Sequence, residues 1–472
     1  MNDSKPDVVI VGSGLSGIVA ARMLAEHSLN VMMVDENIHV GGQLLRRLPE
    51  ALGRDAAYHP DPVKRAGFQF IDSLKTLRID VRNRTRVLGV YPGPELLLEE
   101  GEARVFRVRP RLVLFSTGAR ERFVPFKGWT LPGVVSAGAV QVLLKSSGVL
   151  PARRMLVGGA GLFLFAAAYE ILRHGGKVEA VLEQTPLLPK AIMLTQFFRQ
   201  FSKFAEGARF LGRIAMSGTP VHYRTRILEA RGERDLQAVV TARVDRHGAP
   251  IPGSEKTYPL RSLAVGYGFV PNVELPHLAG CRLEHDAAKG GWVVRVNERL
   301  ETSCENILAA GEITGIAGAL KSITEGRIAS WTILFRLGKT SEHDYLNRLS
   351  GLIRERHSHL QFGRYFNSLY RVPPRATLDA PDDTIVCRCE DVTVGEIKRA
   401  IAEGYRTPQA LKIKTRVSMG DCQGRTCGAA VYDILDAFGH IAPGDMEPFH
   451  ARPPVKPAEL GSLATISPPA PY

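Results

Sequence analysis

Four of the six cysteines in this 472-residue chain lie close enough in sequence to bind one metal centre. Cys387 and Cys389 form a Cys-x-Cys pair, and after a gap of 32 residues Cys422 and Cys427 form a Cys-x-x-x-x-Cys pair. Four thiolates can hold a zinc ion or a [2Fe–2S] cluster. Structural zinc sites favour Cys-x-x-Cys, which neither pair has, so the spacing favours the two-iron cluster. Zinc and a disulfide stay open as less favoured alternatives.

Basic side chains surround these cysteines in the sequence. A cluster held by four thiolates is anionic, and nearby cations would offset its charge. The basic neighbours are Arg388, Lys412, Lys414, Arg416 and Arg425. We expect them to stabilise the cluster.

A glycine-rich loop near the N-terminus has the pattern of a dinucleotide-binding site. Gly12, Ser13, Gly14 and Gly17 follow the apolar run 7–11 and precede a helical stretch. Gly12 allows a tight turn, Gly14 lets the backbone approach a pyrophosphate, and Gly17 lets the helix pack close to the strand. Asp35, at the end of a second apolar run, is spaced to accept hydrogen bonds from a ribose. Together these features predict a nucleotide site.

The same unit recurs about 147 residues later, with one departure. The strand at 154–158 leads into Gly159-Ala160-Gly161, a helix and a strand that ends at Glu183. The third glycine position holds Leu164, which disfavours the close helix–strand contact. Two interpretations stay open: a bound NAD(P), or a Rossmann unit with a vacant or altered pocket.

No other catalytic constellation is visible. The sequence has no Gly-x-Ser-x-Gly, no His-Glu-x-x-His and no Walker loop, and its 13 histidines are dispersed. Catalytic residues therefore stay unassigned.

The elements that position these motifs follow from the apolar runs. Two strand–loop–helix–strand units predict an α/β fold with two Rossmann-like domains. Runs at 111–118, 263–269 and 306–312 are expected to complete their sheets. The segment 384–440 forms a compact unit around the cysteines, and the last 32 residues, with eight prolines, are expected to lie extended over another surface.

Composition excludes several classes of protein. With 44% hydrophobic and 23% charged residues the chain is globular rather than disordered. The net charge of +13 is scattered, without a block of five like charges, which argues against nucleic acid. It leaves open contact with an electron acceptor or a membrane surface. No signal peptide or span of about 20 apolar residues is visible, so we expect a cytoplasmic protein, with peripheral association at the inner membrane as an alternative.

Several motifs, taken in order, resemble a known superfamily. They are GSGLSG, then GGQ at 41–43, STGARER at 116–122, GYGFVPN at 266–272 and ILAAGEITG from residue 307. This order resembles the FAD-containing oxidoreductases of the thioredoxin-reductase and glutathione-reductase superfamily, over residues 1–335. No Cys-x-x-Cys occurs in that part of the chain, so a disulfide reductase is not expected.

The resemblance implies where FAD would bind. Gly12, Ser13, Gly14 and Gly17 would surround its pyrophosphate, and Asp35 and Glu36 would face the adenosine ribose. Val87 would meet the adenine through its backbone, Gly42 and Gln43 would lie near the flavin, and Thr117 and Gly118 belong to the crossover between domains. Gly311 and Glu312 match a motif whose acid, usually Asp, binds the ribityl chain.

The C-terminal pattern CRCEDV…MGDCQGRTC resembles the bacterioferritin-associated-ferredoxin-like [2Fe–2S] domain. Flavin domains followed by this unit are similar to the α subunits of heteromeric amino-acid dehydrogenases of the opine oxidase, D-hydroxyproline dehydrogenase and hydrogen cyanide synthase type. This resemblance implies a partner β subunit that carries its own FAD and oxidises a C–N bond, with a small third subunit left open.

These observations predict five segments. They are a discontinuous FAD domain (1–120 and 265–335), a second Rossmann domain (121–264), a helical linker (336–380), a helical [2Fe–2S] domain (381–440) and a proline-rich tail (441–472).

The leading hypothesis is an FAD and [2Fe–2S] electron-transfer subunit of an amine or amino-acid dehydrogenase. One alternative is a self-contained NAD(P)H-dependent reductase. Another, of a different class, is a non-enzymatic flavin-fold scaffold with a structural zinc.

Overall fold

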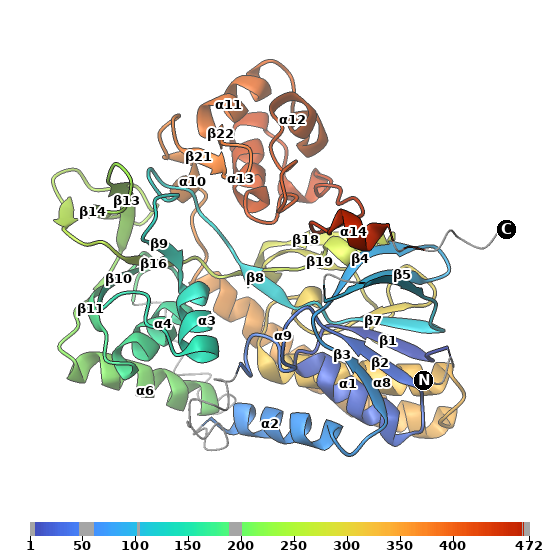
Figure 1. Cartoon of the computed structure of the whole chain (residues 1–472). Coiled ribbons are helices and arrows are strands. Elements are labelled where there is room, and N and C mark those ends of the chain that lie inside the picture. Colours follow the sequence, from blue (N-terminus) through green and yellow to red (C-terminus); the bar gives the residue numbers. More distant parts are fainter. Residues whose placement is uncertain (1–4, 47–60, 102–103, 188–200, 465, 467–472) are drawn as a thin grey trace.

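The first domain is a three-layer unit built on a parallel sheet (Figure 1). The computed structural model describes residues 5–46, 61–101, 104–187, 201–464 and 466. The sheet has the order β20-β7-β1-β2-β3. Its strands are β1 (Val8–Val11), β2 (Val31–Val34), β3 (Ile79–Arg82), β7 (Leu112–Phe115) and β20 (Ile307–Ala309).

Strand β1 is buried on both faces because its alternate side chains serve two cores. Val8 and Ile10 pack with the helices, whereas Val9 and Val11 pack with an antiparallel meander on the other face. The covering helices are α1 (Leu15–Glu26), α2 (Pro62–Leu74) and α8 (Ala319–Arg336). The meander strands are β4 (Thr85–Tyr91), β5 (Glu95–Glu100) and β6 (Arg104–Val108). A continuous apolar run such as VVIV is typical of this doubly covered position.

The second domain repeats the plan with the sheet order β12-β11-β10-β16-β9. Its strands are β9 (Val134–Ser136), β10 (Arg154–Gly159), β11 (Lys177–Glu183), β12 (Val221–Tyr223) and β16 (Leu263–Gly266). The helices are α3 (Ala137–Ser147), α4 (Leu162–Arg173) and α6 (Phe201–Met216), and a second meander comprises β13 (Thr225–Arg231), β14 (Ala238–Arg243) and β15 (Lys256–Tyr258). The expected strand 263–269 thus ends at Gly266, inside the second sheet.

Two antiparallel connecting strands join the domains. Strand β8 (Ala119–Glu121) leaves the first domain, and β17 (Phe269–Pro271) returns to it, antiparallel to β8. A short helix α7 (Glu274–Leu278) and the hairpin β18 (Leu283–Asp286) and β19 (Gly291–Val294) follow. Helix α9 (Glu342–Leu369), capped by the Ser341 side chain, then leads to α10 (Arg375–Leu378).

The cysteine-bearing domain lies above both Rossmann domains in Figure 1. Its elements are β21 (Ile385–Cys387), β22 (Val392–Thr393), α11 (Val394–Ala402), α12 (Pro408–Thr415) and α13 (Gly428–Gly439). Thr393 and Glu396 form a capping box at the start of α11, which fixes where the helix begins. The fold class expected from the sequence, two Rossmann-like domains and a small helical domain, is confirmed.

The C-terminal segment crosses back to the first domain. After the one-turn elements η5 (Pro443–Asp445) and α14 (Leu460–Leu463), Leu463 packs against the meander residues Leu88, Leu97 and Val105. Residues 465 and 467–472 of the expected tail lie outside the described residues. Among the helices described, none has the length and apolarity that a membrane crossing requires.

Candidate cofactor sites and the cavity that joins them

The first glycine loop has the shape of a phosphate cradle. A Cβ atom at Gly12 would lie 2.3 Å from the Ser116 carbonyl oxygen, and one at Gly17 would lie 2.0 Å from the Gly12 carbonyl oxygen. A Cβ atom at Gly14, in contrast, would meet nothing within 4 Å. Gly12 and Gly17 are therefore required by packing, whereas Gly14 borders free space beside the N-terminus of α1, where a pyrophosphate fits.

The acid at the end of β2 holds this loop in place. Ser13 donates to Asp35 Oδ2 from its backbone N–H at 2.7 Å and from its hydroxyl at 2.6 Å. Asp35 Oδ1 accepts from Asn37 N and Nδ2 at 2.8 and 2.7 Å. Glu36 lies beside it and forms an ion pair with Lys456 of the C-terminal segment. Both carboxylates line the cavity described below, as a role at a ribose requires.

Three further residues expected near FAD come from the loop at 41–46 and from β4. Gly42 approaches the glycine loop, because its Cβ would lie 3.0 Å from Gly14 Cα. Gln43 Oε1 accepts from Arg46 Nε at 2.9 Å. Val87 lies on β4 where its register with β5 shifts. All of them line the same cavity.

Thr117 and Gly118 lie directly before the connecting strand β8 and are hydrogen-bonded to Asn272, directly after β17. Thr117 Oγ1 donates to the Asn272 carbonyl oxygen at 2.7 Å, and Asn272 Nδ2 donates back to the Thr117 carbonyl at 2.9 Å. Gly118 has φ +68°, and a Cβ there would meet nothing within 4 Å. These hydrogen bonds join the two connecting strands, β8 and β17, at the cavity wall.

The acid Glu312 begins the one-turn element η4 (Glu312–Thr314), which precedes α8. Its Oε1 accepts from the Gly318 backbone N–H at 2.8 Å and from Ser322 Oγ at 3.4 Å. No hydrogen bond to Oε2 is formed among the described residues. Burial raises the pKa of Glu312, although Lys321 opposes this shift. One oxygen therefore binds the backbone just before α8, and the other is available at the cavity.

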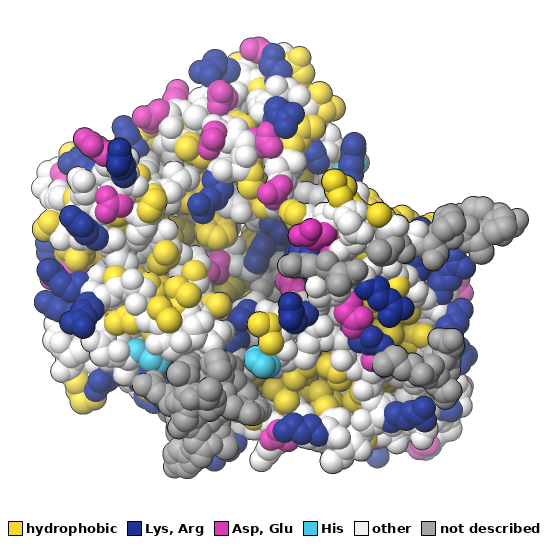
Figure 2. Space-filling model, viewed as in Figure 1, with side chains coloured by type: hydrophobic (Ala, Val, Ile, Leu, Met, Phe, Trp, Pro, Cys, Tyr) yellow, Lys and Arg dark blue, Asp and Glu magenta, His cyan; other side chains and the backbone are white. Residues whose placement is uncertain are grey.

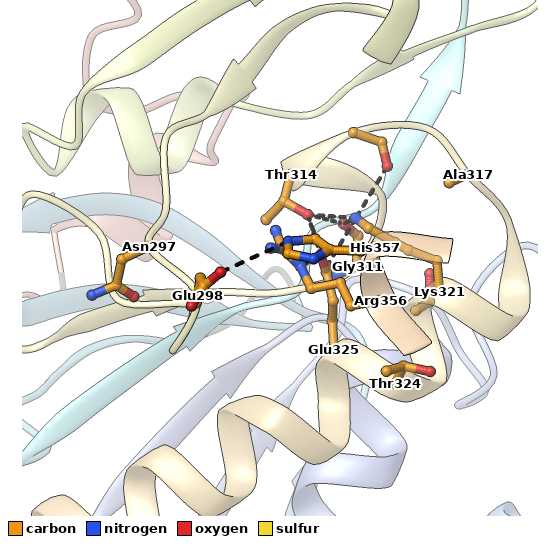
Figure 3. Close-up of polar contacts among 12 residues, drawn as sticks. Asn297, Glu298, Gly311, Thr314, Ala317, Lys321, Thr324, Glu325, Arg356 and His357 are labelled. Atoms are coloured by element: carbon orange, nitrogen blue, oxygen red, sulfur yellow. Dashed lines mark hydrogen bonds and ion pairs between the residues drawn. The ribbon is translucent and has the colours of Figure 1, made fainter. Parts of the chain in front are cut away.

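A buried charge network supports this turn (Figure 3). Lys321, which is fully buried, donates to the Gly311 carbonyl at 2.6 Å and contacts Glu325 Oε2 at 2.9 Å. Glu325 Oε1 also accepts from Arg356 Nε at 2.7 Å. Burial alone would raise the pKa of Glu325, but the two cations outweigh it and hold that pKa below its usual value. The network ties α8 and α9 to the Gly311 turn.

The cysteines meet across the two sequence pairs. Cys427 is close enough to Cys387 to shift the pKa of that thiol, and Cys422 likewise affects the pKa of Cys389. The neighbouring Cys427 thiol lowers the pKa of Cys387 to about 6, so this sulfur is readily a thiolate. None of the cysteines forms a disulfide.

The four cysteines lie close enough to affect one another's pKa across the two sequence pairs. Four thiolates gathered in this way can hold a two-iron cluster.

Two of the five basic residues near the cysteines form ion pairs with acidic side chains. Arg416 pairs with Glu390 at 2.7 Å, and Lys414 pairs with Glu403 at 2.7 Å. Lys412 is near enough to Cys427 for that thiol to affect its pKa. Arg416 and Lys414 thus have acidic partners close by, and the expectation that all five cations offset the cluster charge stays a prediction.

The cofactor loops open on one cavity. Its volume is about 1860 Å³, and Figure 2 shows the surface hollowed where the three parts of the molecule meet. Gly14 of the glycine loop, Gly161 of the second loop and Gly424 of the cysteine loop all line it. Apart from the buried Ser13 and Gly17, the expected FAD residues line it or, like Gly311, lie beside it: Gly12, Gly14, Asp35, Glu36, Gly42, Gln43, Val87, Thr117, Gly118 and Glu312.

In the second glycine loop, a backbone N–H that could bind a phosphate already has a partner within the protein. A Cβ at Gly161 would meet nothing within 4 Å, as at Gly14. The Gly161 N–H, however, donates to the fully buried Glu183 Oε2 at 2.9 Å. Leu164 is fully buried in the core between α4 and the sheet. Helix α4 therefore still packs against the sheet, and the Leu164 side chain forms part of that packing.

Sequence reasoning did not predict the polar link between flavin fold and cysteine loop. On β8, Arg120 Nη2 forms an ion pair with Glu274 at 2.8 Å, and Arg120 Nε donates to the Arg425 carbonyl at 3.1 Å. Arg425 Nη1 donates to the Cys422 carbonyl at 3.3 Å. No local pattern marks Arg120, because its partners Glu274 and Arg425 lie far from it in the sequence.

The matched families agree with this geometry. Residues 6–333 match the pyridine nucleotide-disulphide oxidoreductase family, and residues 385–437 match the BFD-like [2Fe–2S] binding domain. The chain belongs to the pyridine nucleotide-disulphide oxidoreductase family and carries a C-terminal [2Fe–2S] domain. It is an FAD-dependent oxidoreductase, which contradicts the alternative of a non-enzymatic zinc scaffold.

Relatives match over almost the whole chain. The HcnB component of hydrogen cyanide synthase from Pseudomonas protegens is 32% identical, covering 94% of this chain and 97% of the relative. An opine oxidase component from Rhizobium meliloti is 29% identical, covering 98% of each. The alpha chain of sarcosine oxidase from a Corynebacterium is 25% identical over 97% of this chain but only 45% of the longer relative.

Solved structures show the same fold. L-proline dehydrogenase from P. horikoshii superimposes with a TM-score of 0.69 at 19% identity, covering 98% of this chain and 80% of that one. A thioredoxin reductase from T. acidophilum covers 71% of this chain with a TM-score of 0.51. The resemblance stated from the sequence motifs is confirmed at the level of family and fold.

Proposed function

We propose that this chain is the electron-transfer subunit of a heteromeric dehydrogenase that oxidises the C–N bond of an amine or amino acid. The observation that carries the proposal is the single cavity onto which the glycine loop at Gly14 and the cysteine loop at Gly424 both open. When bound, FAD would exchange electrons in pairs or one at a time, and the [2Fe–2S] cluster would exchange them one at a time.

The chain's own residues bind and orient the cofactors. Gly14 leaves room for the pyrophosphate, and Asp35 fixes the loop through Ser13. Glu312, held at the N-terminus of α8, offers one oxygen to the cavity. We assign the four cysteines to the cluster and the cavity residues named above to FAD.

We further propose that the substrate is oxidised on a partner subunit. The relatives are named as subunits of hydrogen cyanide synthase, opine oxidase and sarcosine oxidase, names that denote amine or amino-acid chemistry. In this proposal the partner carries its own FAD, and a small third subunit can complete the complex. We place the complex in the cytoplasm, with peripheral contact at the inner membrane if its electron acceptor lies there.

The test is anaerobic reduction of the native complex, purified through a tag on this chain. Glycine, sarcosine, hydroxyproline and opines are added in turn, and flavin bleaching and cluster absorbance are recorded. We expect one of these substrates to reduce both centres in the complex and none to reduce the isolated chain. Reduction of the isolated chain by an amine would contradict the division of labour.

A second candidate is a self-contained NAD(P)H-dependent reductase, favoured by the free space at Gly161 on the shared cavity. Rapid flavin bleaching of the isolated chain by NADH or NADPH would support this candidate. We expect slow or no bleaching, because Glu183 already occupies the Gly161 N–H.

A further inference from the structure

The C-terminal segment 452–456 touches both cofactor sites. At one end it is held by the cysteine loop: Gln423 Nε2 donates to the Pro454 carbonyl at 2.8 Å, and Gln423 Oε1 accepts from the Arg452 N–H at 3.2 Å. Arg425 Nη1 donates to the Val455 carbonyl at 2.8 Å. Both donor side chains come from the six-residue loop that begins and ends with a cysteine.

At its other end the segment is held by the nucleotide site. The Val455 N–H donates to the Leu88 carbonyl at 2.9 Å, next to Val87 on β4. Lys456 forms an ion pair with Glu36, directly after the acid that fixes the glycine loop. Val455 and Lys456 line the cavity together with Glu36 and Val87, so they form part of its wall.

The two anchorages are adjacent along the chain. Val455 is fully buried, and it bonds to the cysteine loop through its carbonyl and to β4 through its N–H. Because the same residue is hydrogen-bonded to the cysteine loop and to β4, disorder in the cysteine loop would weaken the contact of Val455 with β4. The downstream turn is fixed separately, by Leu463 on the meander.

We propose that residues 452–456 are a strap that completes the adenosine end of the FAD site only while the cysteine loop is folded around its cluster. Filling of the cluster site then slows FAD release, and by reciprocity FAD favours the ordered cysteine loop. This inference rests on the proposed placement of FAD and the cluster.

The charges agree with this role. FAD brings a pyrophosphate dianion to a site that already holds Asp35 and Glu36. Lys456 offsets the charge of Glu36 and is half-buried beside it. Without the strap this cation leaves the site and its edge opens to water.

The experiment compares FAD release from full-length protein with and without its cluster. FAD, iron and sulfide are first quantified; the cluster is then removed with a chelator and reductant. FAD release is followed as flavin transfer to an excess of an FAD-binding apoprotein. We expect cluster removal to speed release about tenfold, within the usual range of coupling between two sites. The variant Cys389→Ser, which lacks a ligand without chemical treatment, should release FAD at the same raised rate.

Two variants test the contacts of the strap directly. Gln423→Leu and Lys456→Glu should release FAD about tenfold faster even with the cluster present, and cluster removal should add little further. Lys75→Glu is the matched control, since it makes the same charge change at an exposed ion pair outside the cavity. It should release FAD as the wild type does.

The possible failures are distinguishable. If the wild type holds no FAD or no iron and sulfide, the proposed function falls and the strap with it. If both cofactors are present and FAD release is equal with and without the cluster, the strap alone is overturned. Strap variants that keep the wild-type rate would overturn it equally.

Discussion

Arg120 of strand β8 donates its Nε–H to the backbone carbonyl of Arg425 at 3.1 Å, which places the flavin fold in direct contact with the loop between two cluster cysteines. Arg120 also pairs with Glu274, whose side chain is 14% exposed. Further contacts dock the same domain: Trp129 Nε1 donates to the Ile385 carbonyl at 2.6 Å, and Arg122 pairs with Asp433 at 2.7 Å. Trp129 also reaches a cluster loop, because the Arg388 guanidinium lies 5.8 Å from the centroid of its ring.

We therefore expect Arg120→Met to destabilise the protein by about 3 kcal/mol, because a largely buried Glu274 loses its nearest cation. The double variant Arg120→Met/Glu274→Leu should recover most of that loss, since an apolar pair leaves no buried charge. Urea unfolding measures both. A double variant no more stable than the single one would contradict this account.

Gly14→Val should abolish FAD retention. The new side chain enters space that is free in the protein itself, and φ at Gly14 is −69°, so the fold should tolerate it. Only the pyrophosphate then competes with it. Flavin absorbance of the purified variant is the measurement. Gly444→Val, also at an open position, is the control and should purify with full flavin.

Cys389→Ser should lose the iron and sulfide of the cluster. The hydroxyl replaces the thiolate that faces Cys422, and one iron is left with a single protein thiolate. Metal and sulfide analysis, with electron paramagnetic resonance after reduction, measures the outcome. Cys304→Ser, at a lone cysteine far from the cluster loops in sequence, should keep the full signal. One zinc per chain in the wild type, with no resonance, would refute the assignment.

Lys321→Met should cost about 3 kcal/mol of unfolding free energy. Glu325 is fully buried and would keep only Arg356 as a cationic partner, and the Gly311 carbonyl would lose the hydrogen bond from Lys321. Chemical denaturation measures the loss. Lys75→Met removes an exposed ion pair and should change stability by less than about 1 kcal/mol. Equal effects of the two variants would show that burial does not matter here.

Leu164→Ala should destabilise the second domain by about 2–5 kcal/mol, because its side chain fills a core position. It should not create a nicotinamide site, since Glu183 still occupies the Gly161 N–H. Calorimetric titration with NADH should give no saturable heat in the wild type or the variant. Micromolar affinity in either protein would disprove this.

The parts of the molecule that were predictable from sequence are those governed by short-range rules. The roles of Gly12, Gly14 and Gly17 follow from their spacing between a strand and a helix, and the structure distinguishes two packing glycines from an open one. The four cysteines were likewise identifiable as a set. Their pairing across the two motifs was not, because it depends on how β21 and the loop before α13 approach each other.

Long-range polar contacts had no signature at all. The ion pair between Glu36 and Lys456 joins positions 420 apart, and Arg120 meets Arg425 over 305 positions. A lone lysine or arginine is usually a solvated surface residue, so nothing local distinguished these from the other cations in the chain. Only the folded arrangement reveals that they connect the two cofactor sites.

Strand β20 pairs with β7, with Ile307 opposite Val113, although the entire second domain separates them in the chain. During synthesis on the ribosome the N-terminal sheet therefore waits with one edge unpaired while the inserted domain emerges and folds. Helix α8, which packs against α1, appears later still. The edge of the nascent flavin sheet at β7 thus stays unpaired for most of translation, and an unpaired strand edge is a template for pairing with other chains.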